Sequence, residues 1–288
     1  MKVLIAIPHY YRPTSAAPDG RPHGSVQRDP LPRVHALDAC LRSLRMLFAP
    51  RVGVLDHASR LARRIDSADP VTIDVVICTT GDFHLLPQLS PGGAGWAQHP
   101  TRADPPLLGY ECHDVLRAHL GRYDLYGYLE DDLVMTDPAF FRKLLWFNRL
   151  FGDGRVLQPN RFESGSHPLV DRFYVDGNLL TQCLPAVAQT AAQPELVAEV
   201  CGRPIVFRTG TNPHAGCFFL TTSQLDDWTR QPTFLDRSSA FIGSLESAAT
   251  LGLATTFTVY KPTPENADFL EIQHYGSAYL SMVPTELS

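Results

Sequence analysis

The chain has 288 residues, 44% of them hydrophobic and 19% charged, which suits one large domain or two small ones around a sizeable core. Its net charge of −5 gives no positive field for a polyanion, so we expect no nucleic-acid partner. No apolar run is long enough to span a bilayer, and the opening run VLIAI is too short for the core of a signal peptide. The sequence therefore predicts no transmembrane segment and a cytoplasmic location.

The first half of the chain alternates between strand and helix patterns. MKVLIAIP is typical of a short buried strand, and a proline-rich loop from Pro8 to Pro32 follows it. Helical spacing of apolar residues predicts a helix over 34–48, and residues 57–66 are expected to form a second, short helix. VTIDVVICTTGD, residues 71–82, predicts the next strand. This order favours a parallel α/β sheet, in which ligand sites lie beyond the carboxyl ends of the strands.

Three adjacent acids follow the next predicted strand. A loop over 90–106 and the helix YECHDVLRAHLGRY precede the strand DLYGYL, which runs directly into Glu130, Asp131 and Asp132. Such carboxylates repel one another, and the cost falls only if a cation joins them or one stays protonated. Alternation along an extended chain would turn Glu130 and Asp132 to one side and Asp131 to the other. A solvated loop whose acids favour the dipole of the next helix is the alternative interpretation.

The second half predicts further strands and helices but no domain boundary. A helix with the body FFRKLLWFNRLF should be capped by Thr136 or Asp137, with Pro138 at its first position. Residues 155–163 predict a strand that leads into a loop, and residues near 185–200 an Ala-rich helix. GCFFLTTSQLDDW predicts a strand followed by a capped helix, and SLESAATLG predicts a helix that ends at Gly252. TTFTVYKP predicts the last strand, which precedes a tail containing EIQHYGSAYL. No linker divides the chain, so we predict a single domain with two halves, 1–135 and 136–288.

The order of these elements resembles a GT-A glycosyltransferase of the family-2 type. The resemblance rests on MKVLIAIPHYYRP, LDACLRSL, IDVVICTTGD and above all YDLYGYLEDDLVM, where such enzymes end a strand with a DXD motif. Here the motif is EDD, with glutamate in the first position. The first 141 residues carry most of the resemblance. It implies a GT-A-like (Rossmann-like) fold, with a mixed, mainly parallel sheet flanked by helices, a nucleotide-sugar and metal site in the first half and an acceptor site in the second.

The resemblance implies a nucleotide site at the ends of the first two strands. Pro8, Tyr10 and Arg12 would hold the base and ribose of a nucleotide sugar, with an aromatic ring available for stacking. Thr79 and Asp82 end the second strand, where an acid often meets the uracil or ribose. An ordinary surface loop for Arg12 and a turn residue for Asp82 are the structural alternatives.

The acidic motif and a C-terminal histidine would bind the metal ion. Asp132 resembles the metal ligand, and Glu130 resembles the acid that contacts ribose or, through water, the metal. Asp131 is grouped with the nucleotide-binding residues, although alternation would turn it away into a structural role. His274 resembles the histidine that completes metal coordination, with a plain surface histidine as the alternative. These oxygen ligands beside one imidazole favour Mn²⁺ or Mg²⁺.

The second half would supply the acceptor site and a general base. In NPHAGCFFLTT, Gly216 would allow close approach to the donor sugar, and His214 is a candidate contact to phosphate or acceptor. Glu246 at a helix start is the candidate base that takes the proton of the acceptor hydroxyl. Asp227 and Asp236 compete for this role. Four residues in predicted loops are further candidates to line the acceptor pocket, and their spacing favours none of them over the others: Asn160, Arg161, Asp171 and Asp176.

The sequence as a whole predicts a metal-dependent, inverting glycosyltransferase. It would transfer a sugar from a UDP- or GDP-sugar to a saccharide or another hydroxyl acceptor. A nucleotidyltransferase that makes a nucleotide sugar is the alternative, although PHYYRPTSAAPDG is a poor match to the Gly-rich basic loop of such enzymes. A non-catalytic nucleotide-sugar-binding protein of the same fold would lack a metal-binding carboxylate, and these carboxylates are present here. The sequence does not predict an oligomeric state.

Overall fold

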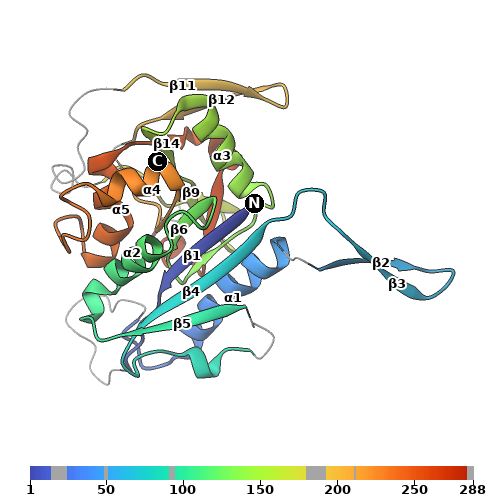
Figure 1. The fold of residues 1–288 in the computed structure, drawn as a ribbon, viewed down its shortest axis with the longest axis horizontal. Coiled ribbons are helices and arrows are strands. Elements are labelled where there is room, and N and C mark those ends of the chain that lie inside the picture. The colour runs from blue at the N-terminus through green and yellow to red at the C-terminus, as the bar shows by residue number, and fades with distance from the viewer. Residues whose placement is uncertain (14–24, 49–50, 91–94, 180–192, 211, 284–288) are drawn as a thin grey trace.

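A five-stranded sheet forms the centre of the fold, in the order β13–β6–β1–β4–β5 (Figure 1). The structure is a computed structural model that describes residues 1–13, 25–48, 51–90, 95–179, 193–210 and 212–283. The five strands are β1 (Lys2–Pro8), β4 (Thr72–Thr80), β5 (Trp96–Thr101), β6 (Leu125–Leu129) and β13 (Cys217–Thr221). β1, β4, β5 and β6 are parallel to one another, and β13 is antiparallel to β6. The predicted mixed, mainly parallel sheet is confirmed, and because β13 of the second half completes it, the chain forms a single domain.

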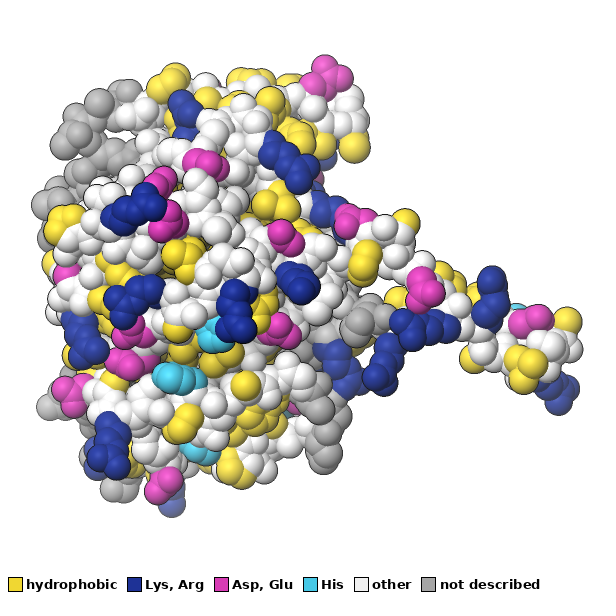
Figure 2. Space-filling model, viewed as in Figure 1, with side chains coloured by type: hydrophobic (Ala, Val, Ile, Leu, Met, Phe, Trp, Pro, Cys, Tyr) yellow, Lys and Arg dark blue, Asp and Glu magenta, His cyan; other side chains and the backbone are white. Residues whose placement is uncertain are grey.

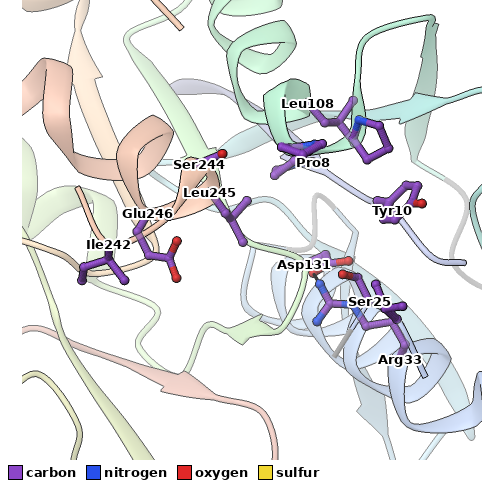
Figure 3. A pocket seen from close by; sticks show the side chains of 14 residues that line it. Pro8, Tyr10, Ser25, Arg33, Leu108, Asp131, Ile242, Ser244, Leu245 and Glu246 are labelled. Atoms are coloured by element: carbon purple, nitrogen blue, oxygen red, sulfur yellow. Dashed lines mark hydrogen bonds and ion pairs between the residues drawn. The ribbon is translucent and has the colours of Figure 1, made fainter. Parts of the chain in front are cut away.

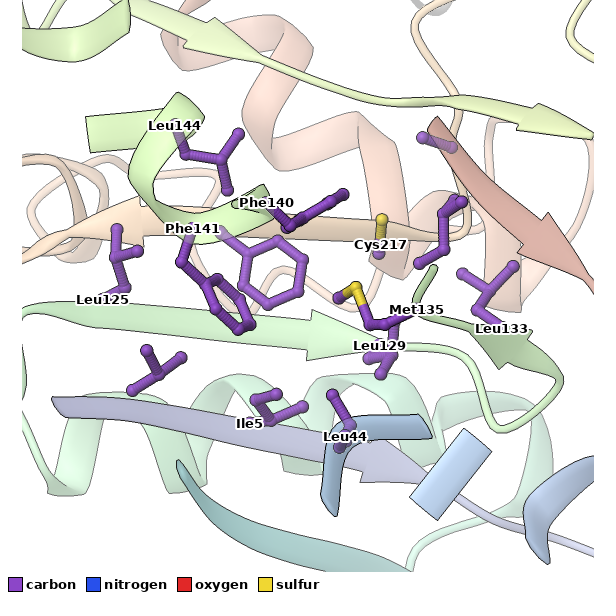
Figure 4. Packing of buried hydrophobic residues seen from close by; sticks show 14 of the residues in the cluster. Ile5, Leu44, Leu125, Leu129, Leu133, Met135, Phe140, Phe141, Leu144 and Cys217 are labelled. Atoms are coloured by element: carbon purple, nitrogen blue, oxygen red, sulfur yellow. The ribbon is translucent and has the colours of Figure 1, made fainter. Parts of the chain in front are cut away.

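Helices cover both faces of the central sheet. α1 (Leu31–Leu47) and α3 (Phe140–Phe151) pack on one face, and α2 (Leu108–Ala118), α4 (Thr222–Thr229) and α5 (Ser244–Thr256) pack on the other. Alternation along β1 explains the two clusters, because Ile5 lies among the residues of α1 and α3 whereas Leu4 lies among those of α2, α4 and α5. Figure 4 shows Phe140 and Phe141 of α3 packed with Leu129 and Ile5 in the first cluster.

Small residues permit close packing between these layers. A Cβ atom on Gly127, in the middle of β6, would lie 2.3 Å from the ring of Phe219 on β13. Phe219 and its neighbour Phe218 are both buried, as expected for core residues. Thr221 and Gln224 form a capping box at the start of α4, which confirms the predicted capped helix.

Two four-stranded sheets lie beside the central one, and all their strands except β7 come from the second half. The first has the order β10–β9–β15–β7, and the second has the order β11–β12–β14–β8. Their strands are β7 (Leu133–Val134), β8 (Arg155–Leu157), β9 (Asn160–Ser164), β10 (Arg172–Tyr174), β11 (Leu196–Val200), β12 (Arg203–Arg208), β14 (Thr258–Pro262) and β15 (Glu271–His274). Short 3₁₀ turns lie at Leu86–Gln88, Pro105–Leu107, Pro264–Phe269 and Leu280–Met282. β7 directly follows the acidic triplet and pairs with β15, so the triplet lies where two sheets meet.

The predicted short helix over 57–66 is wrong. β2 (Val52–Asp56) and β3 (Leu61–Ile65) instead form an antiparallel hairpin that projects from the body (Figure 1). The composition of this segment favours a helix, but Asp56 accepts hydrogen bonds from the backbone N–H groups of Ala58 and Ser59, which closes a turn.

Several element boundaries also differ from the prediction. The part of the predicted Ala-rich helix that the structure describes is β11, and residues 185–192 lie outside the described residues. The loop over 90–106 contains β5, and the predicted tail contains β15. α3 starts at Phe140 with Ala139 at the N-cap and no side-chain cap, although Asp137 accepts the N–H of Ala139 at 2.7 Å.

α5 continues past Gly252 to Thr256 instead of ending there. This glycine lies against Trp228, whose ring would be 2.6 Å from a Cβ atom. Its small size therefore serves packing between α5 and α4. None of the helices within the described residues is long and apolar enough to cross a membrane.

Candidate active site

Two adjoining cavities open beside the carboxyl ends of β1 and β6. The first has a volume of about 400 Å³ and a largely apolar wall that includes Pro8, Tyr10 and Leu108. The second has a volume of about 360 Å³ and contains most of the charged groups of the site. Both are lined by Arg33, Ile242, Leu245 and Glu246. Figure 3 shows Glu246 and Ile242 on one side of the first cavity, with Arg33 and Asp131 on the other.

The acidic triplet is divided between these cavities. Glu130 and Asp132 line the second cavity, and Asp131 lines the first. This is the division that alternation along the extended chain predicts. The two conditions that lower the repulsion are both met, because a cation joins two of the acids and the third is protonated at neutral pH.

Arg33 in the first turn of α1 is that cation. Its Nη1 donates to Asp132 Oδ2 at 2.9 Å, and its Nη2 donates to Asp131 Oδ1. Burial opposes the positive charge, but the two carboxylates outweigh it and raise the pKa of the Arg33 guanidinium. An arginine with a side chain only 12% exposed thus neutralises part of the charge of the triplet.

Asp131 is held from behind by a buried histidine. The backbone N–H of Leu85 donates to His9 Nε2 at 3.1 Å, so the neutral ring carries its proton on Nδ1. Nδ1 then donates to Asp131 Oδ2 at 2.5 Å. With one oxygen on His9 and the other on Arg33, Asp131 has a fixed position at the wall between the cavities. This arrangement fits the structural role that was the alternative for Asp131.

Glu130 is the protonated member of the triplet. Burial, and then the nearby charge of Asp132, raise its pKa to about 8. Its Oε1 atom has no hydrogen-bond partner among the described residues. Gly216 lies against the other oxygen, because a Cβ atom there would be 2.6 Å from Glu130 Oε2, and its φ of 63° also favours glycine. The close approach at Gly216 is therefore made by Glu130, and Gly216 lines neither cavity.

Asp132 and His274 face each other in the second cavity. His274 Nε2 lies 3.8 Å from Asp132 Oδ2, and Asp132 Oδ1 is buried without a hydrogen-bond partner among the described residues. Burial alone would raise the pKa of Asp132, but Arg33 and His274 outweigh it and lower the pKa below its ordinary value. Asp132 is therefore ionised at neutral pH and has one free oxygen.

A carboxylate that the sequence did not reveal orients His274. Fully buried Glu163 on β9 accepts from His274 Nδ1 at 2.8 Å and from the backbone N–H of Leu280 at 2.7 Å. Glu163 thereby fixes the orientation of the ring and turns Nε2 toward Asp132. Metal-binding histidines commonly have such a carboxylate on the second ring nitrogen.

Glu246 lies in the first turn of α5 at the junction of the cavities. Its carboxylate makes no hydrogen bond or ion pair with the described residues, and it folds back to within 2.6 Å of where a Cβ atom on Gly243 would lie. The competing acids are elsewhere: Asp227 pairs with Arg230, and Asp236 accepts the N–H of Ser238. Among the three predicted candidates, only Glu246 lines a cavity.

A buried charge network includes Arg161, which lines the second cavity. Arg161 Nε donates to Asp176 Oδ1 at 2.9 Å, and Lys261 Nζ donates to Asp176 Oδ2 at 2.8 Å. Burial opposes ionisation of Asp176, but the two cations outweigh it and hold its pKa well below the usual range. Nearby His214 bonds Thr250 at 2.8 Å, and burial lowers its pKa, so it is neutral. Of the four predicted loop residues that spacing could not rank, Arg161 alone lines the cavity, and it lies on β9 rather than in a loop.

Three predicted nucleotide contacts line neither cavity. Thr79 is fully buried, where its Oγ1 accepts from Gln98 at 2.9 Å. Asp82 is exposed in the turn after β4. Arg12 is exposed and stacks 5.6 Å from the ring of Phe83, which itself contacts Tyr10. The structure thus brings together Pro8, Tyr10, the acidic triplet, His214, Glu246 and His274, and leaves Arg12, Thr79, Asp82 and Gly216 outside.

Comparison with known proteins gives little information about the function of this chain. No protein-family model matches the chain, and no curated protein matches it in sequence. Among solved structures, it is similar to CMP:2-keto-3-deoxy-manno-octonic acid synthetase in complex with CTP, with 14% identity and a TM-score of 0.38 over 95% of this chain and 90% of the other. That likeness is too distant to bear on activity, so a functional assignment depends on the geometry of the cavities.

Proposed function

We propose that the chain is a metal-dependent glycosyltransferase that moves a sugar from a nucleotide-diphosphate sugar to an acceptor hydroxyl. The observation that carries the proposal is the junction of an apolar cavity that contains Tyr10 with a charged cavity that contains Asp132 and His274. The carboxylate of Glu246, which has no hydrogen bond or ion pair with the part of the chain that the structure describes, lies at this junction. A transferase needs adjoining compartments for donor and acceptor, because the bond that breaks lies between them.

The first cavity suits the nucleotide. Tyr10 offers an aromatic face for a base, and Pro8 and Leu108 add apolar surface. Arg33 at the boundary would face the diphosphate of a UDP- or GDP-sugar, since its guanidinium is buried and lines both cavities. Its charge offsets the carboxylates of Asp131 and Asp132 and so lowers their repulsion of the leaving diphosphate.

The residues of the second cavity fit a divalent metal ion. Asp132 Oδ1 has no hydrogen-bond partner among the described residues, and His274 Nε2, which would bind a metal in its unprotonated form, lies 3.8 Å from Asp132 Oδ2. Within the described residues no ready-made cluster of three or more His, Cys, Asp or Glu side chains is present, so diphosphate and water oxygens would complete the coordination of Mn²⁺ or Mg²⁺. When bound, the ion would neutralise the diphosphate leaving group.

Glu246 would act as the general base. It accepts the proton of the acceptor hydroxyl while that oxygen attacks the anomeric carbon, and the bonding electrons to the sugar leave with the diphosphate. A single displacement of this kind inverts the anomeric carbon. The acceptor, a saccharide or another alcohol, would occupy the second cavity beside Arg161 and Tyr279.

A nucleotidyltransferase that makes a nucleotide sugar is the second candidate. Arg33 favours it as well, because a buried cation beside the nucleotide cavity suits a triphosphate. The loop after β1 lacks the Gly-rich basic motif expected of such an enzyme, which weighs against it. One binding experiment distinguishes the two candidates.

The experiment is a thermal-shift panel of UDP-, GDP-, dTDP- and CMP-sugars with and without Mn²⁺. A ligand that binds only the folded state raises its apparent stability, by about 2.7 kcal/mol at a hundredfold excess over Kd. We expect a metal-dependent shift with a UDP- or GDP-sugar. A shift only with a nucleoside triphosphate and a sugar or sugar phosphate would instead support the second candidate.

Two substitutions test the assigned roles. Asp132→Ala should abolish the metal-dependent thermal shift while the protein stays folded. Full activity of this variant would show that Asp132 is not a metal ligand. Glu246→Gln should lower turnover by about 10²–10⁴-fold while donor binding persists. An unchanged rate would show that another residue acts as the general base. Asp227→Ala is the matched control, because it removes an exposed carboxylate outside both cavities.

A further inference from the structure

Ile242, just before α5, has a strained backbone conformation. Its φ is 53°, in the left-handed region that a β-branched residue rarely adopts. The N–H of Gly243 donates to the carbonyl of Phe241 at 2.6 Å, so Ile242 is the central residue of a γ-turn. A positive φ gives the rarer and strained form of that turn. Glycine would adopt this conformation with less strain than isoleucine.

The neighbours of Ile242 hold the turn in place. Phe241 is fully buried, and the hydroxyl of Ser247 in α5 accepts its N–H at 3.1 Å and donates to its carbonyl at 2.9 Å. The N–H of Ser247 donates in turn to the carbonyl of Gly243 at 2.9 Å. The residues on both sides of Ile242 are therefore fixed to α5. Strained residues persist where the surrounding structure fixes them in this way, and they are frequent at functional sites.

The side chain of Ile242 gains little packing from the folded chain, because it is 54% exposed. Exposed apolar side chains also lie on the arm of β2 and β3, residues 52–65, which projects from the body (Figure 2); Val54, Leu55 and Leu61 are examples. Ile242 differs from them because it lines both cavities of the candidate site. A molecule bound in these cavities would supply the packing that the strained residue lacks.

Ile242 lies beside the proposed general base. Leu245 also lines both cavities, and in Figure 3 the carboxylate of Glu246 lies between these two apolar side chains. Arg33 and Asp131 lie on the opposite side of the first cavity (Figure 3). The junction of the cavities therefore has a charged side and an apolar side, and the base belongs to the apolar side.

We infer that Ile242, with Leu245 beside it, contacts the apolar C–H face of the transferred sugar and keeps water away from its anomeric carbon. The inference rests on the proposed function and adds to it what favours transfer over hydrolysis. Water that reached the anomeric carbon would form a C–O bond to it and lose a proton to Glu246, while the bonding electrons left with the nucleoside diphosphate. Excluding water from the site prevents this loss of donor.

Hydrolysis of the donor without an acceptor tests this role. Release of UDP or GDP is followed with saturating UDP-glucose, UDP-galactose, UDP-N-acetylglucosamine or GDP-mannose, each with Mn²⁺. We expect slow hydrolysis by the wild type and a rate about tenfold higher in Ile242→Gly. Ile242→Asn should behave similarly, because asparagine tolerates a positive φ but is polar. Ile242→Leu should hydrolyse the donor more slowly than these two variants, since it keeps an apolar side chain, and Leu235 already adopts a φ of 58° in this chain.

Calorimetric titration is a second measurement and needs no turnover. Ile242→Gly should weaken binding of the donor by about tenfold and leave binding of UDP or GDP alone unchanged, because the removed side chain contacts only the sugar. Cys201→Gly is the matched control, since Cys201 has a φ of 50°, is exposed and lines neither cavity. This control should alter neither hydrolysis nor binding. Thermal unfolding checks that both glycine variants are folded, as we expect because glycine accepts a positive φ.

The results separate this inference from the proposed function. If the wild type bound and consumed a donor, but Ile242→Gly hydrolysed it no faster and bound it equally well, Ile242 would not contact the sugar and the inference would be wrong. An equal increase of hydrolysis in Cys201→Gly would also overturn it, because the effect would then not depend on the cavities. If the wild type neither bound nor consumed any of these donors, the proposed glycosyl transfer would be wrong, and this inference with it.

Discussion

Glu130 provides a test of the electrostatics of the acidic triplet. It is 7% exposed, and burial together with the charge of Asp132 raises its pKa to about 8, from an ordinary value of 4.5. The folded protein therefore keeps this proton through neutral pH, whereas the unfolded chain loses it near pH 4.5. Glu130→Gln has a similar shape and remains uncharged at every pH, so it isolates the effect of the proton.

The expected effect can be calculated from these two pKa values. Between pH 4.5 and 8 the folded state binds one more proton than the unfolded state, so this group lowers the free energy of unfolding as pH rises. The slope is about 1.4 kcal/mol per pH unit, and over the whole interval the loss approaches about 5 kcal/mol. Glu130→Gln lacks this loss. Its stability relative to wild type should increase from pH 5 to pH 8 and stay constant above that.

Urea unfolding at intervals of pH from 5 to 9, followed by tryptophan fluorescence, measures this difference. Glu199→Gln, an identical substitution at an exposed position of β11, controls for the change in chain charge. Any fixed cost of the buried amide shifts the variant equally at all pH values. If the curves of Glu130→Gln and wild type were parallel, Glu130 would be ionised at neutral pH, and the proton assigned to it would be wrong.

Two further substitutions test the supports of the site. Gly216→Ala would place a Cβ atom 2.6 Å from Glu130 Oε2 at a φ of 63°, so we expect urea unfolding to show a loss of about 1–3 kcal/mol; an unchanged midpoint would argue against this contact. Glu163→Gln should disturb the Nδ1-protonated form of His274, which ¹⁵N chemical shifts report, and weaken the hydrogen bond to the Leu280 N–H. It should also weaken Mn²⁺ binding by about 10–100-fold. Unaltered ¹⁵N shifts of His274 would show that Glu163 does not position this ring.

Local patterns in the sequence predicted the central part of the fold. The β-branched run of β1 and the aromatic run of β6 both form buried parallel strands, because such residues suit a sheet covered on both faces. Strand alternation also predicted how the triplet divides between two directions. The segment GCFFLTTSQLDDW predicted a capped helix start, and the capping box of Thr221 and Gln224 at α4 confirms it, because such a cap needs only residues within one turn.

Other local patterns were misleading, and the arm shows why. Residues 57–66 include Ala, Leu and Arg, which favour helices, but the tight turn after Asp56 pairs the segment with residues 52–56 instead. Gly252 has the position of a helix end by sequence, yet its helix continues to Thr256, and the glycine instead leaves room for the ring of Trp228. In both segments, pairing or packing with other residues outweighed intrinsic preference.

The sequence by itself determined that an acidic triplet ends a buried strand, and that something must relieve its repulsion. Only the tertiary structure decided what does so. Arg33 precedes Asp131 by 98 residues, and Glu163 precedes His274 by 111, so no local pattern connects either pair. The one local signal was a cation in the first turn of a helix, where the helix dipole disfavours it. Burial finally protonates Glu130, because desolvation depends on every segment that packs around a group, and that is known only once the chain has folded.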